Sequence, residues 1–171
     1  MAALANAFLK LPADLKKAVH LDLCERALLV WNHYRETRDP LEYVESVCGT
    51  RRIVDGDLPG AAIRAVRAGE DTESVAARYR EPIVAMQDGD LGFPAEVEFA
   101  YYAIYNLFQR QVTSRLDDDW LIVNQALSAR SESADHAGIL KAAMDAAQKN
   151  RGAGVKAATS AGETAPEARS N

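Results

Sequence analysis

His20 and Cys24 are the two residues of this chain whose types and spacing come closest to a metal site. Residues four apart on a helix share a face, so an imidazole and a thiol at this spacing can bind one zinc ion. Asp22 and Glu25 lie beside them. A zinc site needs three or four ligands, however, and the other two histidines are too distant along the chain. The pattern therefore favours a partly buried histidine and cysteine on a packed helix.

Cys24 and Cys48 also raise the question of nucleophilic catalysis. Neither has a known nucleophile signature around it, and the chain has no CxxC pair or dense cysteine framework. Both cysteines lie in stretches with a helical pattern, so we expect two buried thiols that act as small hydrophobic residues. The residues thus predict no enzyme active site, no cofactor and no metal.

Carboxylates occur close together at three places in the chain. These are Asp88 with Asp90, Glu96 with Glu98, and the triplet 117–119. General acid–base catalysis needs two carboxyl groups that face one cleft in different environments. Turn and helix-cap positions account for all three groups without such a cleft. Because all three lie at expected helix entrances, they can form one negative surface patch.

Residues 93–109 hold six of the ten phenylalanine and tyrosine residues, and a segment this apolar must be covered by the rest of the chain. One helical face of this segment is predicted to be core, and it consists of Val97, Tyr101, Ile104 and Phe108. Tyr102 and Tyr105 lie on a neighbouring face. Tyrosine is also a favoured interface residue, so both core packing and partner contact remain open for these two.

Hydrophobic periodicity and cap residues predict helices along most of the chain. The expected helices span residues 13–35, 41–48 (closed by Gly49), 61–68, 72–86 (with a kink or break at Pro82), 94–109, 117–127 and 134–148. No segment shows the sustained alternation expected of strands. The predicted fold class is all-α, a compact bundle of six or seven helices with a disordered C-terminal tail.

The length of 171 residues has room for one domain and a tail. We expect a helical domain at residues 1–148. Residues 149–171 are rich in small and polar residues, and Val155 is the only large hydrophobic residue among them. This composition predicts a disordered tail.

The formal net charge is −5 and the isoelectric point about 5.2. An acidic balance argues against a nucleic-acid partner and permits a basic protein partner. The N-terminus has no positive region followed by a long apolar run, and no segment approaches the length of a membrane span. The sequence therefore predicts a cytoplasmic protein without a membrane partner.

Three segments together resemble a known class of protein. Residues 21–28, 98–108 and 118–127 look like parts of the small all-helical immunity proteins of bacterial polymorphic toxin systems. The likeness covers about residues 15–130 and consists of core and cap positions, so it assigns no functional residue. It implies a cytoplasmic antidote that binds a toxin domain and blocks its action. Many such toxins are basic nucleases, toward which an acidic protein would be steered.

Three functional hypotheses follow. The first is a non-catalytic immunity protein that binds its cognate toxin through an acidic surface. The second is a homodimeric helical interaction or regulatory module, with an uncovered apolar face around Trp31 or around Tyr102 and Tyr105. The third is a small enzyme that uses carboxylates or a metal. For the first hypothesis the predicted partner-binding residues are Asp88, Asp90, Glu96, Tyr102, Tyr105, Asp117 and Asp118.

Overall fold

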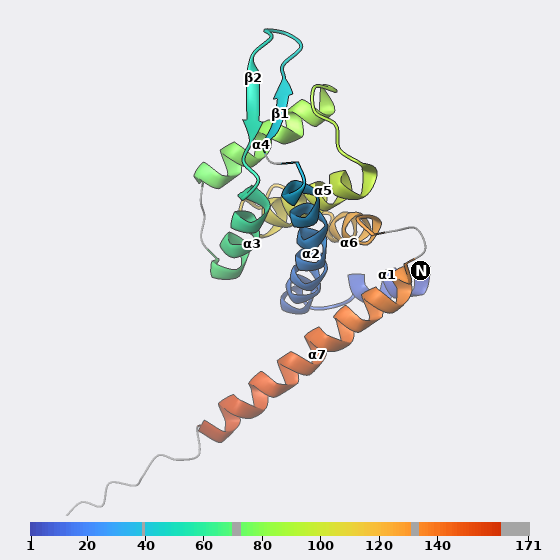
Figure 1. The fold of residues 1–171 in the computed structure, drawn as a ribbon. Helices are drawn as coiled ribbons and strands as arrows, with labels where there is room; N and C mark the ends of the chain where they lie inside the picture. Colours follow the sequence, from blue (N-terminus) through green and yellow to red (C-terminus); the bar gives the residue numbers. More distant parts are fainter. Residues whose placement is uncertain (39, 70–72, 131–133, 162–171) are drawn as a thin grey trace, which may run out of the picture.

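Seven helices and one β-hairpin make up the part of the chain that the computed structural model describes, residues 1–38, 40–69, 73–130 and 134–161. The helices are α1 (Ala2–Leu9), α2 (Ala13–Glu36), α3 (Leu58–Ala68), α4 (Glu73–Gln87), α5 (Ala95–Gln111), α6 (Asp119–Ser128) and α7 (His136–Ala161) (Figure 1). The strands are β1 (Leu41–Val44) and β2 (Arg51–Val54). The predicted all-α class is confirmed, with a small two-stranded sheet added to it.

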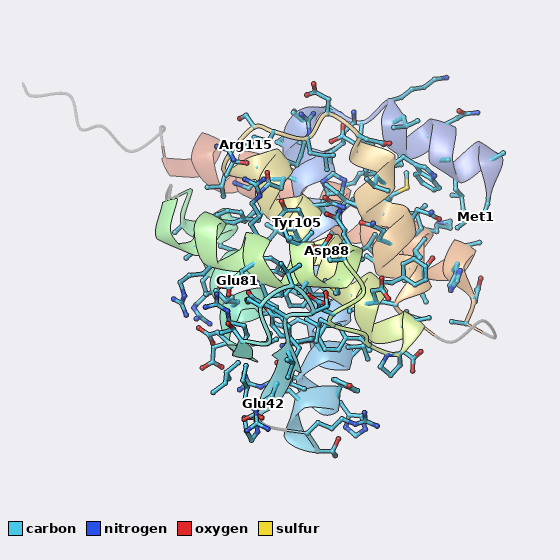
Figure 2. All side chains as sticks on the ribbon, turned by 90° about the horizontal axis from the view of Figure 1, so that it is seen from above. Met1, Glu42, Glu81, Asp88, Tyr105 and Arg115 are labelled. Atoms are coloured by element: carbon cyan, nitrogen blue, oxygen red, sulfur yellow. The ribbon has the colours of Figure 1, made fainter. Side chains whose placement is uncertain are left out.

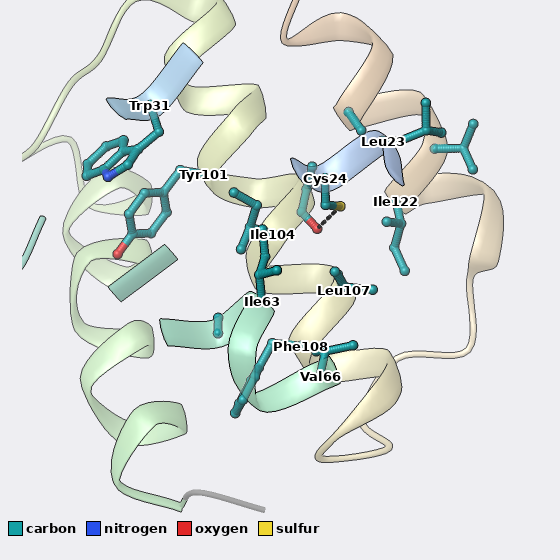
Figure 3. Close-up of a cluster of buried hydrophobic side chains, with 14 of the residues drawn as sticks. Leu23, Cys24, Trp31, Ile63, Val66, Tyr101, Ile104, Leu107, Phe108 and Ile122 are labelled. Carbon is teal, nitrogen blue, oxygen red and sulfur yellow. Dashed lines mark hydrogen bonds between the residues drawn. The ribbon is translucent and has the colours of Figure 1, made fainter. Parts of the chain in front are cut away.

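Helix α5, the aromatic segment, lies at the centre of the fold and packs against α2, α3 and α6. Pro94 precedes it, and Glu96 and Glu98 in its first turn complement the positive end of the helix dipole. The predicted core face is confirmed, since Val97, Tyr101, Ile104 and Phe108 are all buried. Figure 3 shows how side chains of α2, α3 and α6 cover this face.

Helix α2 matches the helix predicted for residues 13–35 almost to the residue. Trp31 near its end packs edge-on against Tyr101, with ring centroids 5.0 Å apart. Its indole N–H donates a hydrogen bond of 2.8 Å to the Gly56 carbonyl before α3. Trp31 is fully buried. The expectation of an uncovered apolar face around this residue is therefore wrong.

The helix predicted for residues 41–48 is also wrong, because this stretch forms β1 and the turn of an antiparallel hairpin. Leu41 and Tyr43 face inward and are buried, whereas Glu42 and Val44 are exposed. Four residues of alternation are too few to stand out from a two-turn helix in the sequence. The segment becomes a strand because 51–54 pairs with it, and that pairing is a tertiary effect.

The hairpin turn places Cys48 on the surface, so the prediction of a second buried thiol is wrong. Gly49 in this turn has a φ of +70°, a conformation that a residue without a Cβ adopts at no cost. Gly49 was predicted to end a helix, and the same freedom of its backbone instead serves the turn between β1 and β2.

The expected end of α3 is confirmed, whereas the expected start of α4 cannot be compared. Helix α3 begins at Leu58, three residues before the predicted start, and ends at Gly69, as expected, with a φ of +69°. Helix α4 contains Pro82. The predicted cap residues Asp71 and Thr72 lie outside the described residues.

Helix α6 is capped as predicted. The Asp118 carboxylate accepts hydrogen bonds from the backbone N–H groups of Trp120 and Leu121, both at 3.0 Å. This residue therefore satisfies two of the donors that every helix start leaves unpaired.

Helix α7 begins at His136 and continues to Ala161, beyond the domain boundary predicted at residue 148. Its first half packs against α1, α2 and α6, and its second half extends away from the other helices (Figure 1). The remainder of the predicted tail, residues 162–171, lies outside the described residues. Within the described chain, no helix combines the length and apolar character needed to cross a membrane.

Helix α1 was not predicted, because alanine dominates it and few of its residues mark an apolar face. Phe8 anchors it in the core, fully buried against the ring of His20 at 5.3 Å and the ring of Trp120 at 6.2 Å. The helix thereby covers the first turns of α2 and the start of α6.

Candidate functional site

A groove of about 580 Å³ lies between the hairpin and the C-terminal half of α4. Its lining residues are Tyr43, Glu45, Val47 and Cys48 of the hairpin and Arg80, Glu81, Val84, Ala85, Asp88 and Asp90 of α4 and the following loop. We call it the acidic groove. Figure 2 looks down on this side of the molecule, where Glu81 lies on α4 and Asp88 just after its end. Four further pockets in the described part of the chain are smaller, at about 110–340 Å³.

The acidic groove combines an apolar floor with carboxylates on its sides. Tyr43 and Ala85 are buried in the floor, and Val84 and Val47 add exposed apolar surface, Val47 with 96% of its area accessible. Four carboxylates and one guanidinium line it, a formal charge of −3. Such a surface suits a ligand that is cationic at its tip and apolar along its stem, as lysine and arginine side chains are.

Two exposed ion pairs link the hairpin to α4. Arg52 of β2 lies 3.0 Å from Glu45 and 3.7 Å from Glu81. A second pair joins Arg78 of α4 to Asp55, directly after β2. The hairpin is therefore linked to α4 on its β2 side.

Glu45 is oriented by two donors. The Cys48 thiol donates to its Oε2 at 2.7 Å, and the Arg52 Nε donates to its Oε1 at 3.0 Å. Hydrogen bonds from Cys48 and then Arg52 lower the pKa of this carboxyl below its usual value. The pKa of Tyr43, in the floor of the groove, is shifted upward instead. Burial is the main cause, and the negative charges of Glu81 and Glu45 add to it. At neutral pH the groove therefore presents an ionised carboxylate beside a neutral phenol.

Asp88 and Asp90 are the two predicted partner-binding residues that the structure brings together in this groove. Asp88 lies directly after the last residue of α4, where the negative end of the helix dipole disfavours an acidic side chain. Among the described residues, neither aspartate forms an ion pair. Their carboxylates thus have no evident role in stability, in contrast to those that cap or begin helices.

The other predicted residues lie elsewhere. Tyr102 lines a separate pocket of about 250 Å³ together with Phe99 on α5. Tyr105 is half-buried and stacks on Tyr79, with ring centroids 5.5 Å apart. Glu96 is exposed in the first turn of α5. The acidic residues therefore do not form the single negative patch that was expected. Of the predicted partner-binding residues, only Asp88 and Asp90 line the groove.

Asp117 and Asp118, also predicted, have roles at the entrance of α6. Asp118 caps the helix, and Asp117 lies 3.3 Å from Arg110. The third member of the triplet, Asp119, is nearly buried and binds Lys16 at 2.9 Å and Arg110 at 2.8 Å. The acidic triplet thus joins α2, α5 and α6 to one another.

The Asp119 carboxyl keeps its charge despite its burial. Burial raises the pKa of this group, but hydrogen bonds from Lys16 and Arg110 and the charges of both outweigh it, so the pKa lies below its usual value. Its backbone carbonyl also accepts a hydrogen bond of 2.9 Å from the His20 ring. This cluster is a structural tie between helices.

His20 and Cys24, the candidate zinc ligands, are both buried and face different partners. The His20 Nε2–H donates to the Asp119 carbonyl, and the Cys24 thiol donates to the Ala103 carbonyl at 3.6 Å (Figure 3). Burial raises the pKa of Cys24, which keeps it a neutral thiol. In the described residues no three histidine, cysteine or acidic side chains gather so that they could hold a metal ion. The zinc hypothesis therefore has no support from the geometry.

His20 should make the fold sensitive to acid. Burial lowers the pKa of this imidazole from 6.5 to about 4. As the pH falls below 6.5, His20 becomes protonated in the unfolded chain but stays neutral in the folded chain until about pH 4. The free energy of unfolding therefore falls across that interval, by about 3 kcal/mol in all. Urea unfolding at pH 7, 5.5 and 4.5 measures this loss.

His20→Gln is the matched control for that measurement, because glutamine keeps an N–H donor for the Asp119 carbonyl and does not titrate. The slope of stability against pH between 6.5 and 4 should be largely absent in this variant. An unchanged slope would show that another group is responsible.

Several groove residues had not been predicted, chiefly Glu45, Glu81, Val84 and Tyr43. On α4 a signal was available, because residues 81, 84, 85 and 88 recur at helical spacing and so share a face. On the hairpin no signal was available once residues 41–48 had been assigned to a helix.

Comparisons of the chain with protein-family models, with curated proteins and with solved structures found no match. The resemblance to immunity proteins therefore stays a prediction, and the function has to be inferred from the geometry of the chain itself.

Proposed function

We propose that the protein is a non-catalytic binding protein that holds a basic partner protein in the acidic groove, in the manner of a cytoplasmic immunity protein that neutralises a toxin domain. The observation that carries this proposal is the groove itself, with its apolar floor and a formal charge of −3 on its lining.

The charges of Asp88 and Asp90 are better explained by partner binding than by stabilisation of the fold. Asp88 and Asp90 form no ion pair within the described chain, and Asp88 opposes the dipole of α4. A lysine or arginine of the partner would neutralise them while its aliphatic stem covers Val84 and Ala85. Electrostatic complementarity of this kind speeds association and selects the partner by its charge.

The proposal predicts that Asp88→Asn with Asp90→Asn weakens binding of the partner by about tenfold or more. The candidate partner is the product of the adjacent gene, tested first by co-expression and then as a purified complex by calorimetry. Because asparagine at position 88 relieves the conflict with the helix dipole, the folded state should not be destabilised. The affinity loss should shrink at high salt, where charge attraction is screened.

Glu96→Gln with Asp117→Asn is the matched control, since it also removes two exposed negative charges but lies outside the groove. This variant should change the affinity by less than about twofold. Equal losses in both variants would place the contact elsewhere on the surface. Absence of both growth rescue and a complex in gel filtration would remove the immunity proposal.

The homodimer alternative has one observation in its favour. Val44 and Ile53 on the outer face of the hairpin are 53% and 67% exposed. This apolar area is small compared with the roughly 800 Å² per partner that a stable interface buries. We therefore place the homodimer second.

A further inference from the structure

We infer that the groove receives an extended, lysine- or arginine-bearing segment of the partner, which pairs with the free edge of β1 as a third strand. This inference rests on the proposed function and adds the shape and the sequence pattern of the bound segment. It depends on three features of the hairpin, namely its hydrogen-bond register, the side of β1 on which the groove lies, and the alternation of its two faces.

The register leaves one edge of β1 unpaired. Glu45 N–H donates to the Thr50 carbonyl at 3.0 Å, and Val44 lies opposite Arg51. In an antiparallel ladder hydrogen-bonded and non-hydrogen-bonded pairs alternate, so the peptide groups of Glu42 and Val44 point away from β2. No hydrogen bond to these groups is found among the described residues. Such an edge is a template for another strand.

This free edge borders the acidic groove. The groove is lined by Tyr43 of β1, by three residues of the hairpin turn and by none of β2. A neighbouring pocket is lined by Ile53 of β2 and by the earlier part of α4 around Arg78, and it shares Tyr43 and Glu81 with the groove. Figure 1 shows the same arrangement, with β1 on the side where α4 ends. A strand added to β1 would therefore lie over the groove, about 4.8 Å from β1.

The two faces of the hairpin set the pattern of the added strand. Its inward side chains would meet Glu81, Asp88 and Asp90, so they should be basic. Its outward side chains would lie beside Val44 on the exposed face, where Ile53 adds apolar area and Glu42 pairs with Arg51, so they should be apolar. The segment that fits is thus one in which basic and apolar residues alternate over about four to six positions, the length of β1 and a little more.

A second copy of this chain fits the same edge poorly. Pairing of β1 with β1 would bring two acidic grooves together, each lined by four carboxylates. Like charges across an interface cost affinity and suppress such pairing. Charge therefore selects a basic partner for this edge.

The test uses an acetylated and amidated synthetic peptide in which three lysines alternate with three valines, and measures its dissociation constant by fluorescence anisotropy. Val44→Pro removes the outward N–H of β1 without removing a hydrogen bond of the hairpin, and should weaken binding by about tenfold. Ile53→Pro makes the same change at the β2 edge and should alter binding by less than about twofold. Equal effects of the two variants, or no effect of Val44→Pro, would overturn strand pairing.

A second arm leaves the protein unchanged, in case the proline variants unfold. One peptide carries N-methyl groups on its valine amides and another on its lysine amides. Since alternate residues of a strand point their amides to opposite edges, pairing predicts that one of these peptides loses affinity and the other keeps it. Equal affinities of the two would contradict pairing.

Failure of this inference and failure of the proposed function give different results. If Asp88→Asn with Asp90→Asn weakens peptide binding but Val44→Pro does not, the groove binds cations without an added strand, and the inference is wrong. If only Val44→Pro weakens binding, the edge pairs but the acidic groove does not select the ligand. A dimeric mass that Val44→Pro abolishes would show that a second copy covers the edge, and this too would overturn the inference.

Discussion

Replacement of Tyr101 by alanine is expected to lower the free energy of unfolding by about 3–5 kcal/mol, the range found when a large buried aromatic side chain is removed. The ring is fully buried. It packs between Trp31 of α2 at 5.0 Å and Tyr79 of α4 at 4.7 Å. The substitution would therefore leave a cavity where three helices meet. Chemical denaturation of the two proteins, with equal denaturant slopes, measures the loss.

Tyr101→Phe is the matched control, because it keeps the ring and removes only the hydroxyl. That hydroxyl is buried and has no hydrogen-bond partner among the described residues. A buried hydroxyl without a hydrogen bond does not stabilise the folded state. Phenylalanine at this position should therefore leave the free energy of unfolding unchanged or raise it slightly. A loss of more than about 1 kcal/mol in this variant would show that the hydroxyl is hydrogen-bonded, for example to a buried water.

Replacement of Asp119 by asparagine is expected to cost about 2–4 kcal/mol. Its carboxylate is 9% exposed and binds both Lys16 and Arg110, which are themselves partly buried. Asparagine keeps the shape but leaves two cations facing each other without an anion between them. The loss is one of helix packing, since these residues belong to α6, α2 and α5.

Asp117→Asn is the control for this prediction. Asp117 contacts the same Arg110 at 3.3 Å, but its side chain is fully exposed. Exposed ion pairs contribute little, so this change should stay within about 0.5 kcal/mol. Similar losses for the two variants would mean that burial does not distinguish the two ion pairs.

Most of the helices could be predicted because their signals are local. Helix α2 has an apolar face that repeats over 24 residues, and α5 has its start marked by Pro94 and two glutamates. Helix α6 begins where a capping aspartate was expected. In each case periodicity and caps agree over several turns, and tertiary packing reinforces what the local sequence favours.

The hairpin could not be predicted, because the strands are four residues long and depend on each other. Leu41, Glu42, Tyr43 and Val44 alternate for one strand only, and the sequence of 51–54 alternates even less, with three of its four residues exposed. Arg52 of β2 also lies 3.7 Å from Glu81 of α4, a residue far along the chain. Contacts between distant segments leave no local pattern in the sequence.

The candidate site shows the same division. Asp88 and Asp90 were predicted because two aspartates around a glycine stand out in a loop. Their partners across the groove, Tyr43 and Glu45, lie on the hairpin and were hidden by the wrong helix assignment. Residues 96, 117 and 118 were grouped with them by charge alone, and charge does not determine which surface a residue occupies.

The central claim, that a basic partner occupies the acidic groove, is tested most directly by NMR of the isotope-labelled protein titrated with the partner. The account predicts that the largest amide shift changes fall on two stretches, 42–50 of the hairpin and 80–90 of α4 and its loop, which together line the groove. Changes concentrated instead around Phe99 and Tyr102, at the separate pocket on α5, would contradict it.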